Sequence, residues 1–213
     1  MDPVLRRPHV WEFGTDHPPL LLLHGTGGNE YDLLGLREHL VPDAPVLAPR
    51  GTVLENGMPR FFRRLREGVF DEEDLRERTD ELAAFLVAAE QQYGVTHGSW
   101  VAIGFSNGAN IASALLLRHP EALSGAVLLA AMVPFQQDEP GEVLTGKRVL
   151  IVNGDRDPMA TPDQTQTLAA RLRERGADVE VRPFPGGHTI DPGQLPHVRR
   201  FLEAFSETRS SAD

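Results

Sequence analysis

Residues 100–117 read Trp-Val-Ala-Ile-Gly-Phe-Ser-Asn-Gly-Ala-Asn-Ile-Ala-Ser-Ala-Leu-Leu-Leu, and this stretch decides the fold. Its first six residues form an apolar run that predicts a buried strand, and the segment from Asn107 to Arg118 predicts a helix of small residues. The pentapeptide Gly104-Phe105-Ser106-Asn107-Gly108 matches Gly-x-Ser-x-Gly, in which a strained strand-to-helix turn lifts a serine hydroxyl above the edge of a sheet. A chance match or an ordinary turn serine is the alternative. The strand before and the helix after favour Ser106 as a nucleophile.

Short apolar runs alternate with helical patterns along the whole chain. The predicted strands are Val10–Phe13, Leu20–His24, Val46–Ala48, Trp100–Phe105, Ala126–Ala131, Arg148–Asn153 and Val179–Phe184. The predicted helices span 71–93, 107–118, 163–175 and 194–205, with a shorter one at 29–40. Most of the strands are continuously apolar, so we expect an α/β fold in which helices cover both faces of a mostly parallel sheet. One domain over residues 1–206 accounts for these elements without a separate cap domain, and a frayed tail is expected over 207–213.

The composition argues against several classes of function. The chain has 213 residues and a formal net charge of −10, whereas nucleic-acid binding requires clustered Lys and Arg. Because there is no cysteine, disulfides, thiolate metal sites and cysteine nucleophiles are excluded. No apolar run approaches the length needed to cross a bilayer of about 30 Å, and the first residues lack the apolar segment of a signal peptide. We therefore expect a cytoplasmic protein with no membrane span and no nucleic-acid partner.

A second glycine-rich loop, His24-Gly25-Thr26-Gly27-Gly28, follows the apolar run that begins at Leu20. Its glycines would allow backbone amides to point at the negative oxygen of a tetrahedral intermediate. The backbone N–H groups of Thr26 and Asn107, the residue after the nucleophile, are the predicted oxyanion donors. A phosphate-binding loop is disfavoured because the Gly-Lys-Ser/Thr ending is missing. His24 is expected to brace this loop through hydrogen bonds.

A serine nucleophile of this kind needs a base and an acid, which in the α/β-hydrolase fold follow in the order Ser, Asp or Glu, then His. His188 lies in a glycine-rich loop after the last predicted strand and is the predicted base, whereas His197 falls within the last predicted helix. The acid candidates Asp155 and Asp157 directly follow another strand. Asp157 is favoured because Pro158 restrains its backbone, and Asp155 more plausibly ties the turn. Asp191 is a third, weaker candidate.

The segment 50–70 follows a strand end on the same side of the sheet and is predicted to form a substrate flap. Its aromatic residues Phe61, Phe62 and Phe70 are the candidates for lining an acyl pocket, although they could equally anchor the loop to the domain. Arg60, Arg63 and Arg64 could meet an anionic substrate group, but a solvated face is favoured.

These motifs together resemble the carboxylesterase/phospholipase family of small α/β-hydrolases, which includes the acyl-protein thioesterases. The resemblance runs from about Leu20 to Phe205, and it assigns Asp157 as the acid and Thr26 and Asn107 as the oxyanion donors. Acyl-protein thioesterases usually carry Gln-Gly-Gly after the nucleophile, whereas this chain has Asn107-Gly108-Ala109. In this respect the chain is more similar to a bacterial branch known as hydroquinone-resistance hydrolases.

The function expected from these features is that of a serine carboxylesterase acting on small, short-acyl esters. Ser106, His188 and Asp157 would form an acyl-enzyme, without any metal or organic cofactor. The alternatives are a thioesterase or lysophospholipase on the same scaffold, or a non-catalytic protein that binds a small ligand. The resemblance alone suggests a homodimer.

Overall fold

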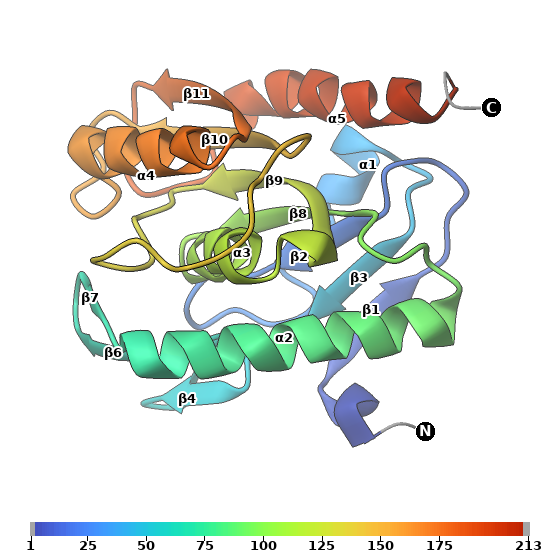
Figure 1. Cartoon of the computed structure of the whole chain (residues 1–213), viewed down its shortest axis with the longest axis horizontal. Helices are drawn as coiled ribbons and strands as arrows, with labels where there is room; N and C mark the ends of the chain where they lie inside the picture. The colour runs from blue at the N-terminus through green and yellow to red at the C-terminus, as the bar shows by residue number, and fades with distance from the viewer. Residues whose placement is uncertain (1–2, 211–213) are drawn as a thin grey trace.

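A single central sheet organises the chain. The structure is a computed structural model that describes residues 3–210, and seven strands form this sheet in the order β1-β3-β2-β8-β9-β10-β11 (Figure 1). β1 pairs with β3 antiparallel, and all other neighbouring pairs are parallel. The strands are β1 (His9–Glu12), β2 (Leu20–Leu23), β3 (Val46–Pro49), β8 (Trp100–Phe105), β9 (Leu123–Leu129), β10 (Arg148–Gly154) and β11 (Asp178–Phe184). The predicted strands are thus confirmed, with ends shifted by a few residues.

The register of the central strands brings the sequence motifs together. Leu23 at the end of β2 pairs with Gly104 of β8, and Phe105 pairs with Leu129 at the end of β9. At the next pair outward, Gly154 of β10 lies beside Phe184 of β11. Since these strands are parallel, the loops that follow them all leave from one edge of the sheet, the edge at which α/β folds bind ligands.

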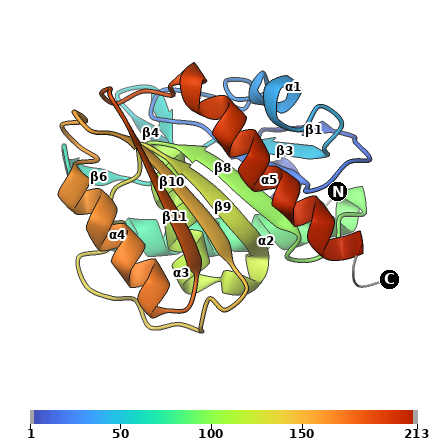
Figure 2. The same ribbon diagram turned by 90° about the horizontal axis from the view of Figure 1, so that it is seen from above.

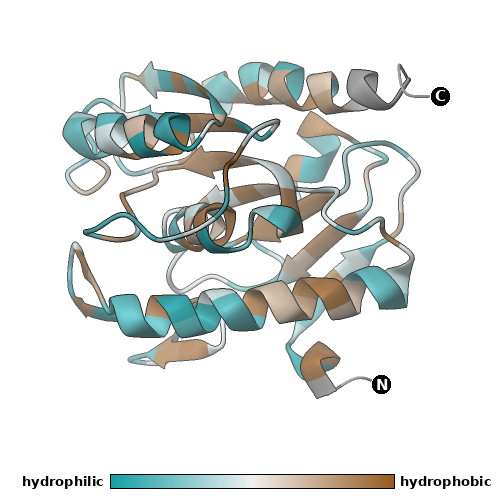
Figure 3. Ribbon diagram, viewed as in Figure 1, coloured by the Kyte–Doolittle hydropathy of each residue, from teal (hydrophilic) through white to brown (hydrophobic). Residues whose placement is uncertain are grey.

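Helices cover both faces of the sheet, as expected (Figure 2). One core lies between the sheet and α2 (Glu72–Tyr93), α3 (Asn107–Arg118) and α4 (Pro162–Glu174). The other core lies between the sheet and α1 (Leu36–Leu40) and α5 (Leu195–Ser210). The strands between the layers are strongly hydrophobic, whereas α4 and the first half of α2 are largely hydrophilic (Figure 3). None of the helices between residues 3 and 210 is long and apolar enough to cross a membrane.

The ends of α2 follow directly from the sequence. Asp71 caps the helix by accepting a hydrogen bond from the Asp74 amide at 3.2 Å. Gly94 ends it in the left-handed region at φ 71°, which glycine adopts without steric cost. Both ends agree with the predicted helix over 71–93.

Two predicted elements differ from the structure. The segment predicted as a helix over 29–40 is helical only from Leu36, and residues 30–35 form successive turns. The Asn29 side chain accepts a hydrogen bond from the Tyr31 amide, a local turn that competes with helix formation. α5 continues to Ser210, into the stretch predicted as a frayed tail over 207–213. Residues 211–213 lie outside the described residues.

The segment predicted as a flap folds into two short β-hairpins rather than a loop. The first pairs β4 (Val53–Glu55) with β5 (Met58–Arg60), and the second pairs β6 (Arg64–Arg66) with β7 (Val69–Phe70). Neither hairpin joins the central sheet. Together they form a small extension of the domain, and the described residues contain no separate cap domain.

Candidate active site

Ser106 occupies a strained turn between β8 and α3. Its backbone has φ 52° and ψ −113°, a conformation that costs a non-glycine residue about 1–3 kcal/mol. The Ser106 amide donates to the Leu129 carbonyl at 2.9 Å, which holds the turn against β9. A Cβ at Gly108 would lie 2.0 Å from the Leu23 carbonyl oxygen, and one at Gly104 would lie 2.5 Å from the Gly108 oxygen. The turn therefore requires both glycines of the pentapeptide.

His188 and Asp157 extend from Ser106 in one chain of hydrogen bonds. His188 Nε2 lies 2.8 Å from Ser106 Oγ, and His188 Nδ1 lies 2.7 Å from Asp157 Oδ2. The Asp157 side chain is fully buried. A buried carboxylate accepts a hydrogen bond from Nδ1–H, which leaves the Nε2 lone pair directed at the serine hydroxyl.

The other candidate acids and the other histidine lie elsewhere. Asp155 accepts a hydrogen bond from the Gly186 amide at 3.2 Å and so ties the two loops together. Asp191 caps a short turn through the Gly193 amide. His197, on α5, contacts Glu180 at 2.6 Å.

The predicted oxyanion donor Thr26 lies in the glycine-rich loop after β2, and Asn107 begins α3 directly after the serine. Gly25 approaches β8 so closely that a Cβ there would lie 2.8 Å from the Phe105 ring. The Gly27 amide donates to the Pro59 carbonyl, and the Gly28 amide donates to the Gly25 carbonyl. Within residues 3–210, no hydrogen bond uses the amide of Thr26 or of Asn107. Both amides are therefore available to an incoming oxygen.

His24 braces the oxyanion loop, as predicted. Its Nε2 accepts a hydrogen bond from the Gly51 amide at 3.0 Å, so Nδ1 carries the proton and donates to the Gly25 carbonyl at 2.6 Å. Burial lowers the pKa of His24 below its ordinary value, although the Gly25 carbonyl acts in the opposite direction. The neutral ring is the form that satisfies both contacts.

The predicted flap residues separate into two groups. Phe61 and Phe62 are fully buried in the core beneath α2 and do not line the pocket, so this part of the prediction is corrected. The Phe61 amide also donates a hydrogen bond to Asn107 Oδ1 at 2.7 Å, and this contact holds the side chain that follows Ser106. Phe70 packs edge-on against Phe62 and does line the pocket.

The prediction of a solvated face is wrong for Arg60. Its side chain is only 4% exposed, because it turns inward and donates to Thr26 Oγ1 at 2.9 Å and to the Phe62 carbonyl at 3.1 Å. Arg64 is partly buried and also lines the pocket. Arg63, 60% exposed, agrees with the prediction.

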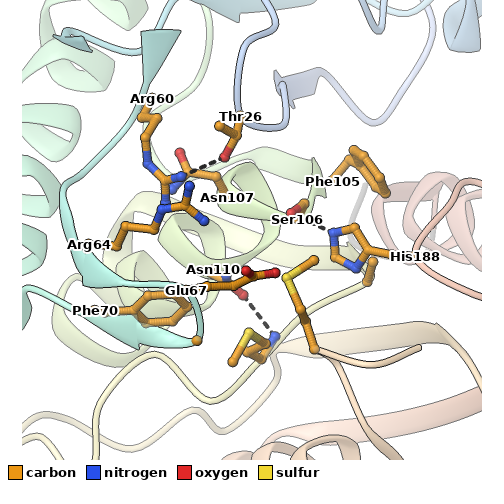
Figure 4. Close-up of a pocket in the computed structure, with 14 residues that line it drawn as sticks. Thr26, Arg60, Arg64, Glu67, Phe70, Phe105, Ser106, Asn107, Asn110 and His188 are labelled. Carbon is orange, nitrogen blue, oxygen red and sulfur yellow. Dashed lines mark hydrogen bonds between the residues drawn. The ribbon is translucent and has the colours of Figure 1, made fainter. Parts of the chain in front are cut away.

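These groups surround a cavity of about 240 Å³ that opens above Ser106 (Figure 4). Its wall consists of Thr26, Arg60, Arg64, Glu67, Gly68, Phe70, Phe105, Ser106, Asn107, Asn110, Ala130, Met132, Met159 and His188.

Several wall residues were missed by sequence reasoning. Asn110 lies one helical turn after Ser106 and accepts a hydrogen bond from the Met132 amide at 2.8 Å. Its spacing of four residues from the nucleophile was the available signal, since residues four apart share a helix face. Met132 follows β9, and Met159 follows Asp157 in the loop after β10. Both belong to loops at the carboxyl edge of the sheet, but their direction depends on tertiary contacts.

The fold and this arrangement of a serine, a histidine and an aspartate define the class of α/β-hydrolase proteins. The sequence profile of the Phospholipase/Carboxylesterase family matches residues 14–206, and the chain belongs to this family.

Three known proteins illustrate the similarity. The MhqD protein of Bacillus subtilis (strain 168) is 46% identical over 195 residues, which are 92% of this chain and 97% of that protein. The crystal structure of the Bacillus cereus carboxylesterase has a TM-score of 0.91 and 46% identity, and covers 94% of this chain and 95% of its own. The structure of YahD with malic acid has a TM-score of 0.88 and 27% identity, and covers 93% of this chain and 99% of its own.

Proposed function

We propose that the protein is a serine carboxylic-ester hydrolase that acts on small esters with short acyl chains. The observation that carries this proposal is the chain of hydrogen bonds from Ser106 through His188 to the buried Asp157, at the base of a cavity. The similarity to the Bacillus cereus carboxylesterase supports an ester as the substrate.

The reaction would proceed through an acyl-enzyme. His188 Nε2 takes the proton of Ser106 as Oγ attacks the ester carbonyl, and the amides of Thr26 and Asn107 stabilise the negative oxygen. His188 then gives this proton to the departing alcohol. Water repeats the sequence on the acyl-enzyme and releases the acid. Asp157 keeps the imidazole oriented and stabilises its positive charge during both acylation and deacylation.

The size of the cavity supports a short acyl chain. About 240 Å³ is smaller than the usual ligand pocket, which holds roughly 300–1,000 Å³. The two short hairpins supply Arg60, Arg64 and Phe70 to the cavity wall, and no cap domain within the described residues enlarges the cavity.

Replacement of Ser106 by alanine tests the nucleophile. We expect S106A to lose labelling by a fluorophosphonate probe and most of its esterase activity, because the attacking oxygen is gone. Ser99→Ala is the matched control, since Ser99 precedes the opposite end of β8. Labelling of S106A at the wild-type rate would overturn the assignment.

An acyl-chain series then tests the substrate class. Acetyl and butyryl esters should turn over faster than long-chain lipid esters, and oxygen esters faster than the matching thioesters. Faster turnover of long-chain lysophospholipids or of thioesters would assign the site to one of those substrates instead. Failure of every activated ester would leave a non-catalytic ligand-binding role.

A further inference from the structure

Two arginines form one wall of the cavity, although an ester carbonyl and its oxyanion donors require neither. The Arg60 side chain is 4% exposed, and the neighbouring Arg64 side chain is 28% exposed. Burying a guanidinium is costly unless it is paired. Burial, with Arg64 nearby, lowers the pKa of Arg60 below its ordinary value, and only Glu55 acts in the opposite direction.

Of the two acidic groups nearby, only one pairs with these arginines. Glu55 is the single carboxylate paired with both arginines, at 3.2 Å from Arg60 Nη1 and 2.9 Å from Arg64 Nε. Glu67 also lines the cavity, but it is exposed and makes no ion pair within residues 3–210. Two guanidinium groups therefore share one close counter-charge.

Donor groups also remain unused on this wall. The hydrogen bonds of Arg64 to the described chain all use Nε, and those of Arg60 use Nε and Nη1. Two nitrogens of Arg64 and one of Arg60 are thus left without a protein acceptor in that part of the chain. The planar fork of a guanidinium binds a carboxylate or a phosphate through two parallel hydrogen bonds, and the carboxylate is the smaller of the two anions.

The position of the arginines selects one end of the substrate. His188 protonates the departing alcohol, so the alcohol lies on the His188 side of Ser106. Arg60 and Arg64 lie on the side of Ser106 away from His188 (Figure 4). With the oxyanion held by the Thr26 and Asn107 amides and the alcohol beside His188, the part of the cavity that Arg64 and Phe70 line is left for the acyl group.

We propose that Arg60 and Arg64 bind a carboxylate at the far end of the acyl group, so that the preferred substrates are half-esters of short dicarboxylic acids. This inference rests on the proposed ester hydrolysis and names its substrate class. Water adds across the ester bond: its hydroxyl completes the new carboxylic acid, its proton goes to the alcohol, and the distal carboxylate is unchanged. The products are an alcohol and a dicarboxylate.

A matched pair of substrates tests the proposal directly. Monomethyl succinate carries the distal carboxylate, and methyl levulinate has a neutral methyl ketone at the same place. We expect kcat/KM for the half-ester to exceed that for the ketone by about tenfold, as one partly exposed charge-assisted hydrogen bond would give. The preference should shrink as salt rises, because the contact is electrostatic and partly exposed.

Three variants locate the preference within the cavity. Arg64→Gln should lower the ratio of the two kcat/KM values by about tenfold. Glu67→Gln should raise that ratio by about two- to threefold, because it removes an exposed like charge from the cavity mouth. Arg66→Gln is the matched control: Arg66 is an exposed arginine on the same strand and does not line the cavity, so the ratio should stay at the wild-type value.

The outcomes separate this inference from the proposed function. A wild-type ratio of one or less, with methyl levulinate still hydrolysed, overturns the carboxylate site and leaves the esterase intact. An equal change of the ratio in R64Q and R66Q would also overturn the carboxylate site. A stronger preference for O-acetylglycolate, which carries its carboxylate on the alcohol, would overturn it as well. Misfolding of R64Q could lower activity, but it would not explain an increased ratio in E67Q. The proposal requires both changes. No turnover of any ester, including phenyl acetate, overturns both proposals.

Discussion

At the scale of single residues, the two oxygens of Asp157 have different roles. Oδ1 accepts hydrogen bonds from the amides of Met159 and Ala160, at 2.8 and 3.0 Å. Only Oδ2 is left to face His188 Nδ1. The backbone thus fixes the rotation of the carboxylate, and the carboxylate fixes the tautomer of the imidazole. Through His188, the buried Asp157 side chain thus determines that Ser106 Oγ donates its proton to Nε2, although Asp157 does not contact the serine.

Asp157→Asn should therefore lower kcat by about 10³–10⁴-fold with little loss of stability. The asparagine oxygen would keep the two amide contacts, so its NH2 group would point at Nδ1 and force the proton onto Nε2. His188 could then no longer accept the serine proton. Steady-state kinetics on a short ester would measure the effect, with Asp155→Asn as the control because Asp155 only ties the loops. Equal losses in both variants would contradict this role.

At the scale of elements, the strand β5 connects the substrate wall to the reacting groups. Pro59 accepts a hydrogen bond from the Gly27 amide, Arg60 holds the Thr26 hydroxyl, and Phe61 holds the Asn107 side chain. β5 and Phe61, which directly follows it, therefore contact both predicted oxyanion residues. A shift of this strand would move both donors at once.

Phe61→Ala and Phe70→Ala should act differently because one side chain is in the core and the other is in the cavity wall. F61A should lower the free energy of unfolding by about 3–5 kcal/mol, as expected when a fully buried phenylalanine is removed. F70A should instead raise KM for short esters with a smaller change in stability. Urea titration and steady-state kinetics of both variants would measure this. A larger stability loss in F70A than in F61A would contradict the assignment.

The sequence was most informative where the chemistry is local. Ser106, Asp157 and His188 stand in short motifs whose glycines and proline restrict the backbone, so it could be predicted that these three side chains meet. Phe61 and Arg60 could not be placed in this way. Their direction depends on contacts with Asn107 and Thr26, which are distant in the sequence.

At the scale of the whole molecule, the sheet divides the interior into two apolar cores, and His24 is buried beside the edge where the site lies. Its neutral ring joins the oxyanion loop to the segment at Gly51. Asp32 and Glu30 raise its pKa and Arg50 lowers it, but desolvation has the largest effect. A proton on Nε2 would oppose the Gly51 amide directly. Folding therefore favours the neutral form of this histidine.

This burial predicts a loss of stability in mild acid. In the unfolded chain, His24 becomes protonated near its ordinary pKa of 6.5. In the native protein it stays neutral until the pH falls to its lower native pKa. The contribution is thus fully present above pH 6.5 and is lost between those two values, with a slope of at most about 1.4 kcal/mol per pH unit. Urea titrations at a series of pH values would measure it. His24→Gln should be less stable at neutral pH but should lose this slope, whereas His39→Gln, at an exposed position, should keep it. An unchanged slope in H24Q would assign the acid sensitivity to another group.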